Sequence, residues 1–240
     1  MARIYVVTPT YNEKDNLPIL TEKIFALKIP ELHLMVIDDN SPDGTGKIAD
    51  ELRQKYPVDS TGSPRVTVIH REKKSGLGKA YAQGFQALPP EAEIIIQMDA
   101  DLSHDPSVIP KMLEKIKEYD LVLGSRYIPG GKIENWDPIR IFISRFGNIC
   151  ARVVLGLPYH DLTGGFKCFR REVLEKIDLP SLSSVGYNFQ IETTYAAHKK
   201  GFKICEIPIT FTERKTGKSK FNLAITLEAF WKVLMLRYKS

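Results

Sequence analysis

Residues 94–106 read IIIQMDADLSHDP, and this stretch decides which fold the sequence predicts. Its first part, Ile94–Met98, is a short and mostly apolar run of the kind that forms a buried strand. The run ends directly in Asp99 and Asp101, which point to the same side of an extended chain because they are two residues apart. Two such carboxylates suit a hard cation such as Mg²⁺ or Mn²⁺. The alternative is a solvated turn in which Asp105 caps the following helix.

The same arrangement of an apolar run and a polar segment recurs along the first half of the chain. Further strands are predicted at residues 4–7, 34–37, 66–69 and 121–123, and amphipathic helices at 14–28, 45–55, 78–88 and 107–118. Nearly continuous apolar strands that alternate with helices indicate a parallel sheet. We therefore predict an α/β fold with a mostly parallel central sheet covered by helices on both faces. Ligands of such sheets bind beyond the carboxyl ends of the strands.

The second half of the chain is less regular. The sequence predicts a long loop at 126–138, a helix at 139–156, strands at 163–169 and 202–207 with a helix at 186–200 between them, a basic loop at 213–220 and a final helix at 222–238. No repeat, low-complexity tract or clear linker divides the chain, which favours a single domain.

The overall composition is that of an ordinary globular protein. Hydrophobic residues make up 43% of the 240 residues, and 34 Lys and Arg against 29 Asp and Glu give a net charge of +5. These values exclude a disordered or collagen-like chain, and the charge is too small to indicate a nucleic-acid partner. Three cysteines without a CxxC pair favour thiols in a reducing compartment. Because no apolar run has spanning length and no signal peptide is evident, we expect neither secretion nor a membrane-spanning segment.

Two further segments carry polar groups at predicted strand ends. Asp38 and Asp39 end the second strand, where acidic groups often accept hydrogen bonds from ribose hydroxyls or base N–H donors; turn and capping chemistry is the alternative. Gly76–Lys79 opens a helix, where backbone N–H groups and Lys79 suit an anion. The segment matches neither the P-loop nor the dinucleotide-binding pattern, and a glycine N-cap in a flexible loop explains it equally well.

Several arginines suit bidentate phosphate recognition. Arg126 follows the fifth predicted strand, and Arg145 lies in the helix at 139–156. We interpret Arg140 and Arg152 of the same helix as surface residues. His104 follows Ser103 directly, so the pair is wrongly placed for a catalytic triad, and we interpret this histidine as structural.

Together the polar segments resemble the dolichyl- and polyprenyl-phosphate mannose synthases, a group of inverting GT-A glycosyltransferases. The resemblance runs from about residue 4 to about residue 225. It rests on the order and spacing of PTYNEKDNLP (9–18), IDDNSPDGT (37–45), REKKSGLGKAY (71–81), MDADLSHDP (98–106), GSRY (124–127), ISRFGN (143–148), DLTGGFKCFRREVLEKI (161–177), GYNFQIE (186–192) and EIPITFTERKTGKSK (206–220).

The resemblance implies roles for individual residues. Asp99 and Asp101 would hold Mg²⁺ or Mn²⁺ on the diphosphate of a sugar nucleotide. Asp101, Arg126 and Arg145 would be catalytic, and the two arginines would steer the lipid phosphate and the transferred sugar. The nucleotide-sugar site would comprise Pro9, Tyr11, Glu13, Asp38, Asp39, Gly76, Lys79, Asp99, Ala100, Asp101, Arg214 and Lys220. Ser219 would join the lipid-phosphate site, in a mobile loop that closes over the donor together with Arg214 and Lys220.

One position departs from the family pattern. Many relatives carry Gln two residues after the second aspartate and use it as a further metal ligand, whereas this chain has Ser103. Ser103 is therefore a candidate third ligand, and the choice between the two metals stays open.

The resemblance implies inverting transfer of mannose from GDP-mannose to a dolichyl or polyprenyl monophosphate, which gives a β-linked product. One alternative is a polyprenyl-phosphate glucosyl or N-acetylhexosaminyl transferase that uses a UDP-sugar. Another is a non-catalytic nucleotide-sugar-binding subunit of a membrane glycosylation complex. We expect a catalytic domain at 1–220, with a nucleotide-sugar half at 1–125 and an acceptor half with the closing loop at 126–220, and an amphipathic helix at 221–240.

A lipid acceptor implies contact with a membrane surface. The segments 139–157 and 222–238 are apolar enough to lie at an interface, with Trp136 and Trp231 as candidate headgroup anchors. The alternative is that both helices pack on the sheet. We expect a peripheral protein on the cytoplasmic side of a membrane, with small membrane anchor subunits as candidate partners.

Overall fold

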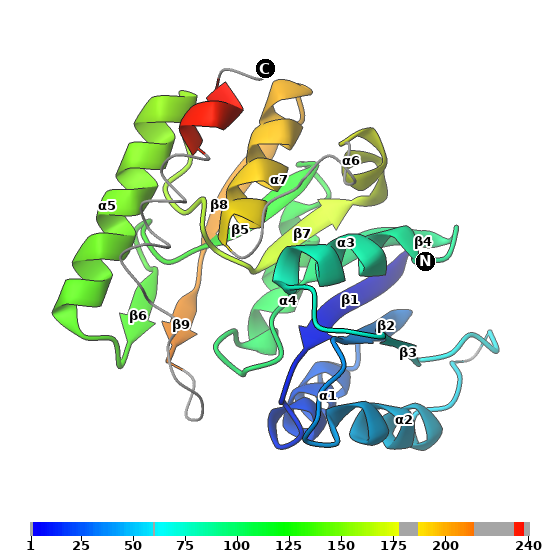
Figure 1. Cartoon of the computed structure of the whole chain (residues 1–240). Coiled ribbons are helices and arrows are strands. Elements are labelled where there is room, and N and C mark those ends of the chain that lie inside the picture. The colour runs from blue at the N-terminus through cyan, green and yellow to red at the C-terminus, as the bar shows by residue number, and fades with distance from the viewer. Residues whose placement is uncertain (1, 60, 178–186, 214–232, 238–240) are drawn as a thin grey trace.

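A seven-stranded sheet forms the centre of the molecule (Figure 1). The structure is a computed structural model and describes residues 2–59, 61–177, 187–213 and 233–237. The strand order is β3-β2-β1-β4-β7-β5-β8, and β7 runs antiparallel to both of its neighbours whereas the other pairs are parallel. The strands are β1 (Arg3–Thr10), β2 (Leu32–Asp38), β3 (Val66–His70), β4 (Ala92–Gln97), β5 (Leu121–Ser125), β7 (Lys167–Arg170) and β8 (Ile204–Pro208). The predicted mostly parallel sheet is confirmed.

Helices cover both faces of the sheet, as predicted. Residues of α1 (Asn16–Ala26), α2 (Thr45–Lys55) and α4 (Ile109–Lys115), which follows the short 3₁₀ helix η1 (Pro106–Val108), pack into one hydrophobic cluster. Residues of α3 (Leu77–Gln86), α6 (Arg171–Lys176) and α7 (Tyr187–Lys199) pack into a second cluster. The strands alternate between the clusters, as Val6 and Val7 of β1 show, because successive side chains of a strand point to opposite faces.

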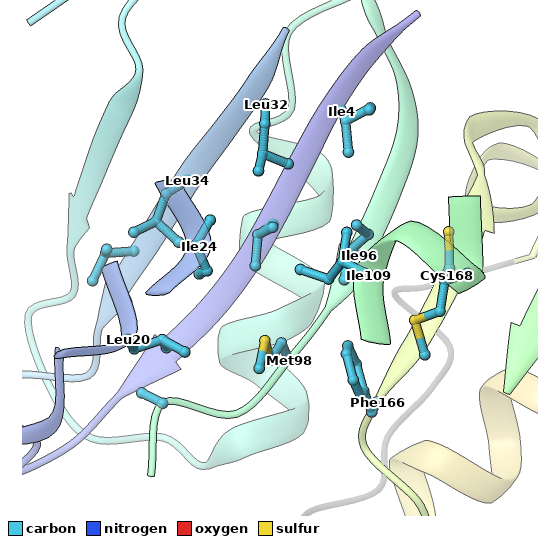
Figure 2. Packing of buried hydrophobic residues seen from close by; sticks show 14 of the residues in the cluster. Ile4, Leu20, Ile24, Leu32, Leu34, Ile96, Met98, Ile109, Phe166 and Cys168 are labelled. Carbon is cyan, nitrogen blue, oxygen red and sulfur yellow. The ribbon is translucent and has the colours of Figure 1, made fainter. Parts of the chain in front are cut away.

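Figure 2 shows the first cluster, in which aliphatic side chains of α1 and α4 meet the sheet. Ile24 lies beside Leu34 of β2, and Ile109 lies beside Ile96 of β4. Each of these side chains is at most 2% exposed, and burying one contributes about 1.5–3 kcal/mol. The cluster therefore fixes β4, the strand that leads into Asp99 and Asp101.

A second, two-stranded sheet lies inside the segment that the sequence predicts to be a loop. β6 (Lys132–Glu134) pairs in parallel with β9 (Thr210–Thr212), so the prediction of a loop throughout 126–138 is wrong. A three-residue strand carries too little periodicity to be recognised, and its partner lies far along the chain. An isolated bridge between His104 and Phe211 ties the second sheet to the segment after β4.

The helix predicted at 139–156 is present as α5 (Pro138–Leu155), which stands on the β8 side of the sheet, apart from α1 and α2 (Figure 1). Most of the predicted C-terminal helix lies outside the described residues. Residues 233–237 are helical, and Val233 is buried against α5 and α7. Among the residues that the structure describes, no helix is both long enough and apolar enough to cross a membrane.

Gly84 of α3 tests how tightly this helix packs on the sheet. A Cβ atom at Gly84 would lie 2.8 Å from Ile37 Cδ1 and 2.9 Å from Val7 Cγ1. Overpacking costs about 1–3 kcal/mol, and the better helix propensity of alanine offsets up to about 1 kcal/mol. We expect Gly84→Ala to lower the free energy of unfolding in urea by about 1–2 kcal/mol.

Gly147 of α5 provides the matched control, because a Cβ atom there meets nothing within 4 Å. Gly147→Ala should raise the free energy of unfolding by about 0.5–1 kcal/mol. Equal effects of the two substitutions would contradict the close packing of α3 on Val7 and Ile37.

Candidate active site

The segment after β4 presents two half-buried carboxylates that hydroxyl groups hold in place. The Tyr81 hydroxyl of α3 donates a hydrogen bond of 2.7 Å to Asp99 Oδ1, and the Ser103 hydroxyl donates one of 2.5 Å to Asp101 Oδ1. Burial, and then the charge of Asp99, raise the pKa of Tyr81 well above its usual value, so its hydroxyl stays protonated and can donate. Leu102 lies between the two aspartates and Ser103 with φ of +60°, a conformation that is uncommon outside glycine.

The donor set fits a divalent cation of the hard type. Asp99 and Asp101 supply carboxylate oxygens, which Mg²⁺ and Mn²⁺ prefer. Gly165 leaves room beside them, because a Cβ atom at that position would lie 3.0 Å from Asp99 Oδ2. The structure places Ser103 as a donor to Asp101, so its hydroxyl orients this carboxylate; a role as metal ligand stays a prediction.

His104 lies behind the carboxylates in an aromatic environment. Its ring stacks on Phe166 at a centroid distance of 5.1 Å and meets the Phe211 ring edge-on at 5.4 Å. Burial lowers the pKa of His104, which favours the neutral ring. Its Nδ1 atom lies 3.4 Å from the backbone nitrogen of Asp99. These contacts agree with the predicted structural role.

The loop that enters β7 brings Asp161 to Arg126. Because β7 is antiparallel, it begins at the edge where β4 and β5 end. Arg126, which follows β5 and is 6% exposed, donates from Nε and Nη2 to the two Asp161 oxygens at 2.7 and 2.8 Å. Burial by itself would raise the pKa of Asp161, but the charge and hydrogen bonds of Arg126 lower it below its ordinary value. No local pattern in the sequence indicates this partner, because the two residues are 35 positions apart in the chain.

Tyr127 joins the two arginines that the sequence singled out. The guanidinium carbons of Arg126 and Arg145 lie 5.2 and 5.7 Å from the centre of its ring. The Tyr127 hydroxyl donates a hydrogen bond of 2.6 Å to Ser144 of α5. Arg126 and the exposed Arg145 thus approach one aromatic ring, although they come from different elements.

Asn148 attaches α5 to the loop before β7. Its Oδ1 atom accepts a hydrogen bond of 2.8 Å from the backbone N–H of Leu162, and its Nδ2 atom donates one of 3.0 Å to the Thr163 hydroxyl. The same hydroxyl accepts a hydrogen bond of 2.8 Å from Arg126 Nη2. Asn148 therefore positions the helix that carries Arg145, a role that its place in the sequence does not reveal.

Aromatic and basic side chains pack on one another beside the second sheet. The Arg140 guanidinium carbon lies 3.8 Å from the centre of the Trp136 ring, and Arg140 forms an ion pair with Glu213. Trp136 also meets Phe211 edge-on at 5.4 Å. The interpretation of Arg140 as a surface residue is therefore wrong, because its side chain is only 15% exposed and packs on Trp136. A role of Trp136 as a headgroup anchor stays a prediction. The Trp136 indole nitrogen is buried without a hydrogen-bond partner in the described part of the chain.

A buried lysine links β7 to α7. Lys167 of β7 is 1% exposed and donates from Nζ to the carbonyl of Gln190 at 2.6 Å and to the hydroxyls of Thr193 and Thr194, each at 2.9 Å. Burial lowers the pKa of Lys167 to about 7. Beside it, Gln97 Nε2 donates to the carbonyl oxygen of Gly165 at 2.9 Å, which fixes the glycine next to Asp99.

The acidic pair after β2 organises the neighbouring loops. Asp39 accepts hydrogen bonds from Arg71 Nη1 at 2.5 Å and from the backbone N–H groups of Ser75 and Gly76 at 3.2 Å. Asp38 accepts one of 2.5 Å from the Ser41 hydroxyl. The structure thus shows the turn and capping contacts that were the alternative interpretation, and a nucleotide role for these residues stays a prediction.

The other predicted nucleotide residues lie along the same edge of the sheet. Lys74 Nζ lies 3.4 Å from the centre of the Tyr11 ring, and Glu13 Oε2 accepts a hydrogen bond of 2.7 Å from Asn16. Pro9 lies near the end of β1, and Ala100 follows β4. Gly76 and Lys79 lie at the start of α3, the helix that follows β3. Arg214, Ser219 and Lys220 lie outside the described residues.

Residues 5–178 match the sequence profile of Glycosyl transferase family 2. The chain belongs to this family. It is 45% identical over 233 residues to the polyprenol monophosphomannose synthase of Mycolicibacterium smegmatis, which covers 96% of this chain and 85% of the relative. It is 41% identical over 228 residues to the undecaprenyl-phosphate mannosyltransferase of Micrococcus luteus, with 95% and 90% covered.

Solved structures agree with the GT-A fold. A complex of glucosyl-3-phosphoglycerate synthase from Mycobacterium tuberculosis with Mn²⁺, UDP and glucosyl-3-phosphoglycerate matches with a TM-score of 0.68 and 18% identity, covering 99% of this chain and 79% of that one. A complex of the same enzyme with Mn²⁺ and UDP-glucose matches with a TM-score of 0.66 and 18% identity, covering 99% and 78%. At this identity the likeness concerns the fold alone. The predicted fold and family of this glycosyltransferase are confirmed.

The ion pair between Arg126 and Asp161 yields a stability prediction. We expect Asp161→Asn to lower the free energy of unfolding at neutral pH by about 3–5 kcal/mol, because it leaves a buried guanidinium without its partner. Folding lowers the pKa of Asp161 below its ordinary value of 3.8. The pair therefore stabilises the fold fully above that value, and the contribution is lost as the pH falls through the lowered pKa. Urea unfolding at several pH values measures both effects.

The exposed pair between Arg171 and Glu175 of α6 serves as the control. Its carboxylate side chain is 58% exposed, so Glu175→Gln should change the free energy of unfolding by less than about 0.5 kcal/mol. Asp161→Asn should also lack part of the acid sensitivity of the parent protein. An equal loss from both variants would show that the Asp161 pair is not the stronger one.

Proposed function

We propose that this glycosyltransferase transfers mannose from GDP-mannose to a polyprenyl or dolichyl monophosphate and inverts the sugar linkage to β. The observation that carries the proposal is that a pair of carboxylates and a pair of arginines lie at the same edge of the sheet. Asp99 and Asp101 follow β4, whereas Arg126 follows β5 and approaches the Tyr127 ring together with Arg145 of α5. Carboxylates suit a metal-bound diphosphate, and arginines suit a second anion.

The relatives support this choice of sugar and acceptor. The two relatives are a polyprenol monophosphomannose synthase and an undecaprenyl-phosphate mannosyltransferase, so mannose and a polyprenyl phosphate are common to both. The runner-up is transfer from a UDP-sugar, since the solved structures of similar fold hold UDP or UDP-glucose at 18% identity. A non-catalytic subunit is disfavoured because this chain keeps the carboxylates and arginines together.

We propose that Asp99 and Asp101 bind Mg²⁺ or Mn²⁺ against the donor diphosphate, with Ser103 and Tyr81 holding the two carboxylates in orientation. Such an ion would neutralise the negative charge that develops on the leaving diphosphate. The nucleotide site in the half at 1–125 would be lined by Pro9, Tyr11, Glu13, Asp39, Gly76 and Lys79. Arg214 and Lys220 would close over the donor from the half at 126–220.

The acceptor does not need a strong general base. A phosphate monoester has a second pKa of about 6, so it is largely ionised at neutral pH. This agrees with a neutral His104 that is buried between two aromatic rings. The chain must instead hold two anions in line for attack on the anomeric carbon. We assign this role to Arg145 and Arg126, with Asp161 fixing the guanidinium of Arg126.

We further propose that α5 rests on a membrane surface on its cytoplasmic side. Five side chains at helical spacing form an apolar stripe on this helix and are 54–77% exposed: Ile139, Phe142, Phe146, Ile149 and Val153. Arg145 and Arg152 lie on the same helix, and basic residues next to an exposed apolar face are typical of interfacial helices. Small membrane anchor subunits are candidate partners for this stripe or for the segment at 221–240.

The decisive experiment measures transfer of labelled mannose from GDP-mannose to a short, detergent-soluble polyprenyl phosphate during a titration of Mg²⁺ and Mn²⁺. We expect Asp101→Asn to lower kcat at least about a hundredfold, since electrostatic stabilisation of the leaving group is worth several kcal/mol. Asp105→Asn is the matched control in the same loop, because Asn caps a helix as well as Asp does. Parallel assays with UDP-glucose test the runner-up.

Near-normal transfer by Asp101→Asn would disprove the metal assignment, and transfer from UDP-glucose alone would disprove the choice of donor. Absence of transfer from either donor, with both still binding in a thermal-shift assay, would favour the non-catalytic subunit.

The membrane proposal predicts weaker vesicle binding when the stripe on α5 becomes polar. Phe142→Ser together with Phe146→Ser should weaken binding to vesicles that contain anionic lipids by at least about tenfold, because burial of one large apolar side chain contributes about 1.5–3 kcal/mol. Ile19→Ser on α1 is the control, since Ile19 is also exposed, at 46%. Co-sedimentation measures the binding, and the rate with a soluble acceptor should stay unchanged. Equal binding by both variants would refute the assignment of the stripe.

A further inference from the structure

A second cluster of ligand-type side chains lies at the opposite edge of the sheet, away from the candidate active site. Glu31 directly precedes β2, His33 is near the start of β2, and Asp59 lies in the loop between α2 and β3. One potential ligand atom from each residue lies within 4.8 Å of the other two. The side chains are 16%, 1% and 10% exposed, in the same order.

The hydrogen bonds of His33 determine which of its ring nitrogens faces this cluster. Nδ1 lies 2.9 Å from the carbonyl oxygen of Pro64. A carbonyl oxygen can only accept, so Nδ1 carries the proton and donates it. Nε2 then points at Asp59 Oδ2 across 3.4 Å, and neither atom has a hydrogen-bond partner in the described part of the chain.

In a neutral imidazole, this arrangement would set the lone pair of Nε2 against a carboxylate oxygen. Burying two acceptors face to face is unfavourable, so a positive species belongs between them. The separation of 3.4 Å equals that of two ligand atoms on a tetrahedral zinc ion, which is about 3.3–3.4 Å for bonds of about 2.0–2.1 Å.

The surroundings hold both side chains as a metal site requires. Metal-ligating histidines usually donate their other N–H to a carbonyl or carboxylate, as His33 does to Pro64. The His33 ring also stacks on Tyr5 at a centroid distance of 4.7 Å. Asp59 Oδ1 accepts hydrogen bonds from the Thr61 N–H at 2.8 Å, the Thr61 hydroxyl at 2.7 Å and the Ser63 N–H at 2.9 Å. These bonds turn Oδ2 towards His33.

We propose that Glu31, His33 and Asp59 bind one zinc ion, with water as the fourth ligand. An imidazole in the ligand set favours Zn²⁺ over Mg²⁺, which distinguishes this site from the two carboxylates after β4. Arg3 Nε lies 3.7 Å from Glu31 Oε2, so the ion displaces that weak contact. Arg3 keeps its hydrogen bonds to Glu91 at 2.7 Å and to Thr61 at 3.1 Å. The ion would join the start of β2 to the loop before β3.

The test uses zinc alone on protein stripped of metal by a chelator, with excess Mg²⁺ present to occupy the carboxylates after β4. Titration calorimetry should detect one equivalent of bound zinc in the parent protein and none at this site in His33→Gln. At a hundredfold excess of free zinc over Kd, the Tm should rise by about 5–10 °C in the parent protein only. Co²⁺ should give the visible absorption of a tetrahedral site.

His70→Gln is the matched control, because His70 also faces a carboxylate, Asp50 Oδ2 at 3.1 Å, but its side chain is half exposed. This variant should bind zinc as the parent does. If His33→Gln does not fold, Glu31→Gln, whose side chain lies at the rim of the site, should lose zinc affinity at least tenfold.

Two results would overturn the proposal. One is equal zinc binding by the parent protein, His33→Gln and Glu31→Gln. The other is a parent protein whose Tm does not respond to zinc at any concentration tested.

Discussion

The antiparallel course of β7 between β4 and β5 is the constraint on which the candidate site depends. An antiparallel strand begins where its parallel neighbours end, so the loop that enters β7 lies at the edge where Asp99 and Arg126 follow their own strands. This loop supplies Asp161 to Arg126 and Gly165 to Asp99. With a parallel strand in that place, the loop would lie at the other edge and neither contact would form.

The buried pair of Arg126 and Asp161 extends this constraint into the acceptor side. A guanidinium that is 6% exposed needs a fixed carboxylate, because an unpaired buried charge is costly. The fixed pair in turn orders Thr163, which contacts both Arg126 and Asn148 of α5. The helix that carries Arg145 is therefore attached to the loop that holds Arg126. This attachment explains how two arginines from different elements approach one tyrosine ring.

The geometry of α5 matches an acceptor with a charged head and an apolar tail. Arg145 lies next to Phe146 in the chain, and both side chains are exposed. One helix therefore offers a cation for a phosphate and an apolar stripe for a lipid surface. Family membership and the two mannosyltransferase relatives agree with such an acceptor. The cluster of Glu31, His33 and Asp59 lies at the other edge of the sheet, where a bound ion would act on stability and not on the reaction.

Local patterns in the sequence predict the strands and helices of the first half of the chain, and the edge of the sheet at which the polar segments gather. These features follow from local patterns, since apolar runs such as Ile94–Met98 and helical periodicity involve residues close in the chain. Three features become visible only in the folded structure: β7 is antiparallel, β6 pairs with β9, and Trp136 packs on Arg140. The same holds for the pair of Asp161 and Arg126 and for the approach of Asp59 to His33. Apart from Trp136 and Arg140, which are neighbours on one short segment, these contacts join residues 26 to 78 positions apart in the chain. Strand order, which no local pattern encodes, brings these distant residues together.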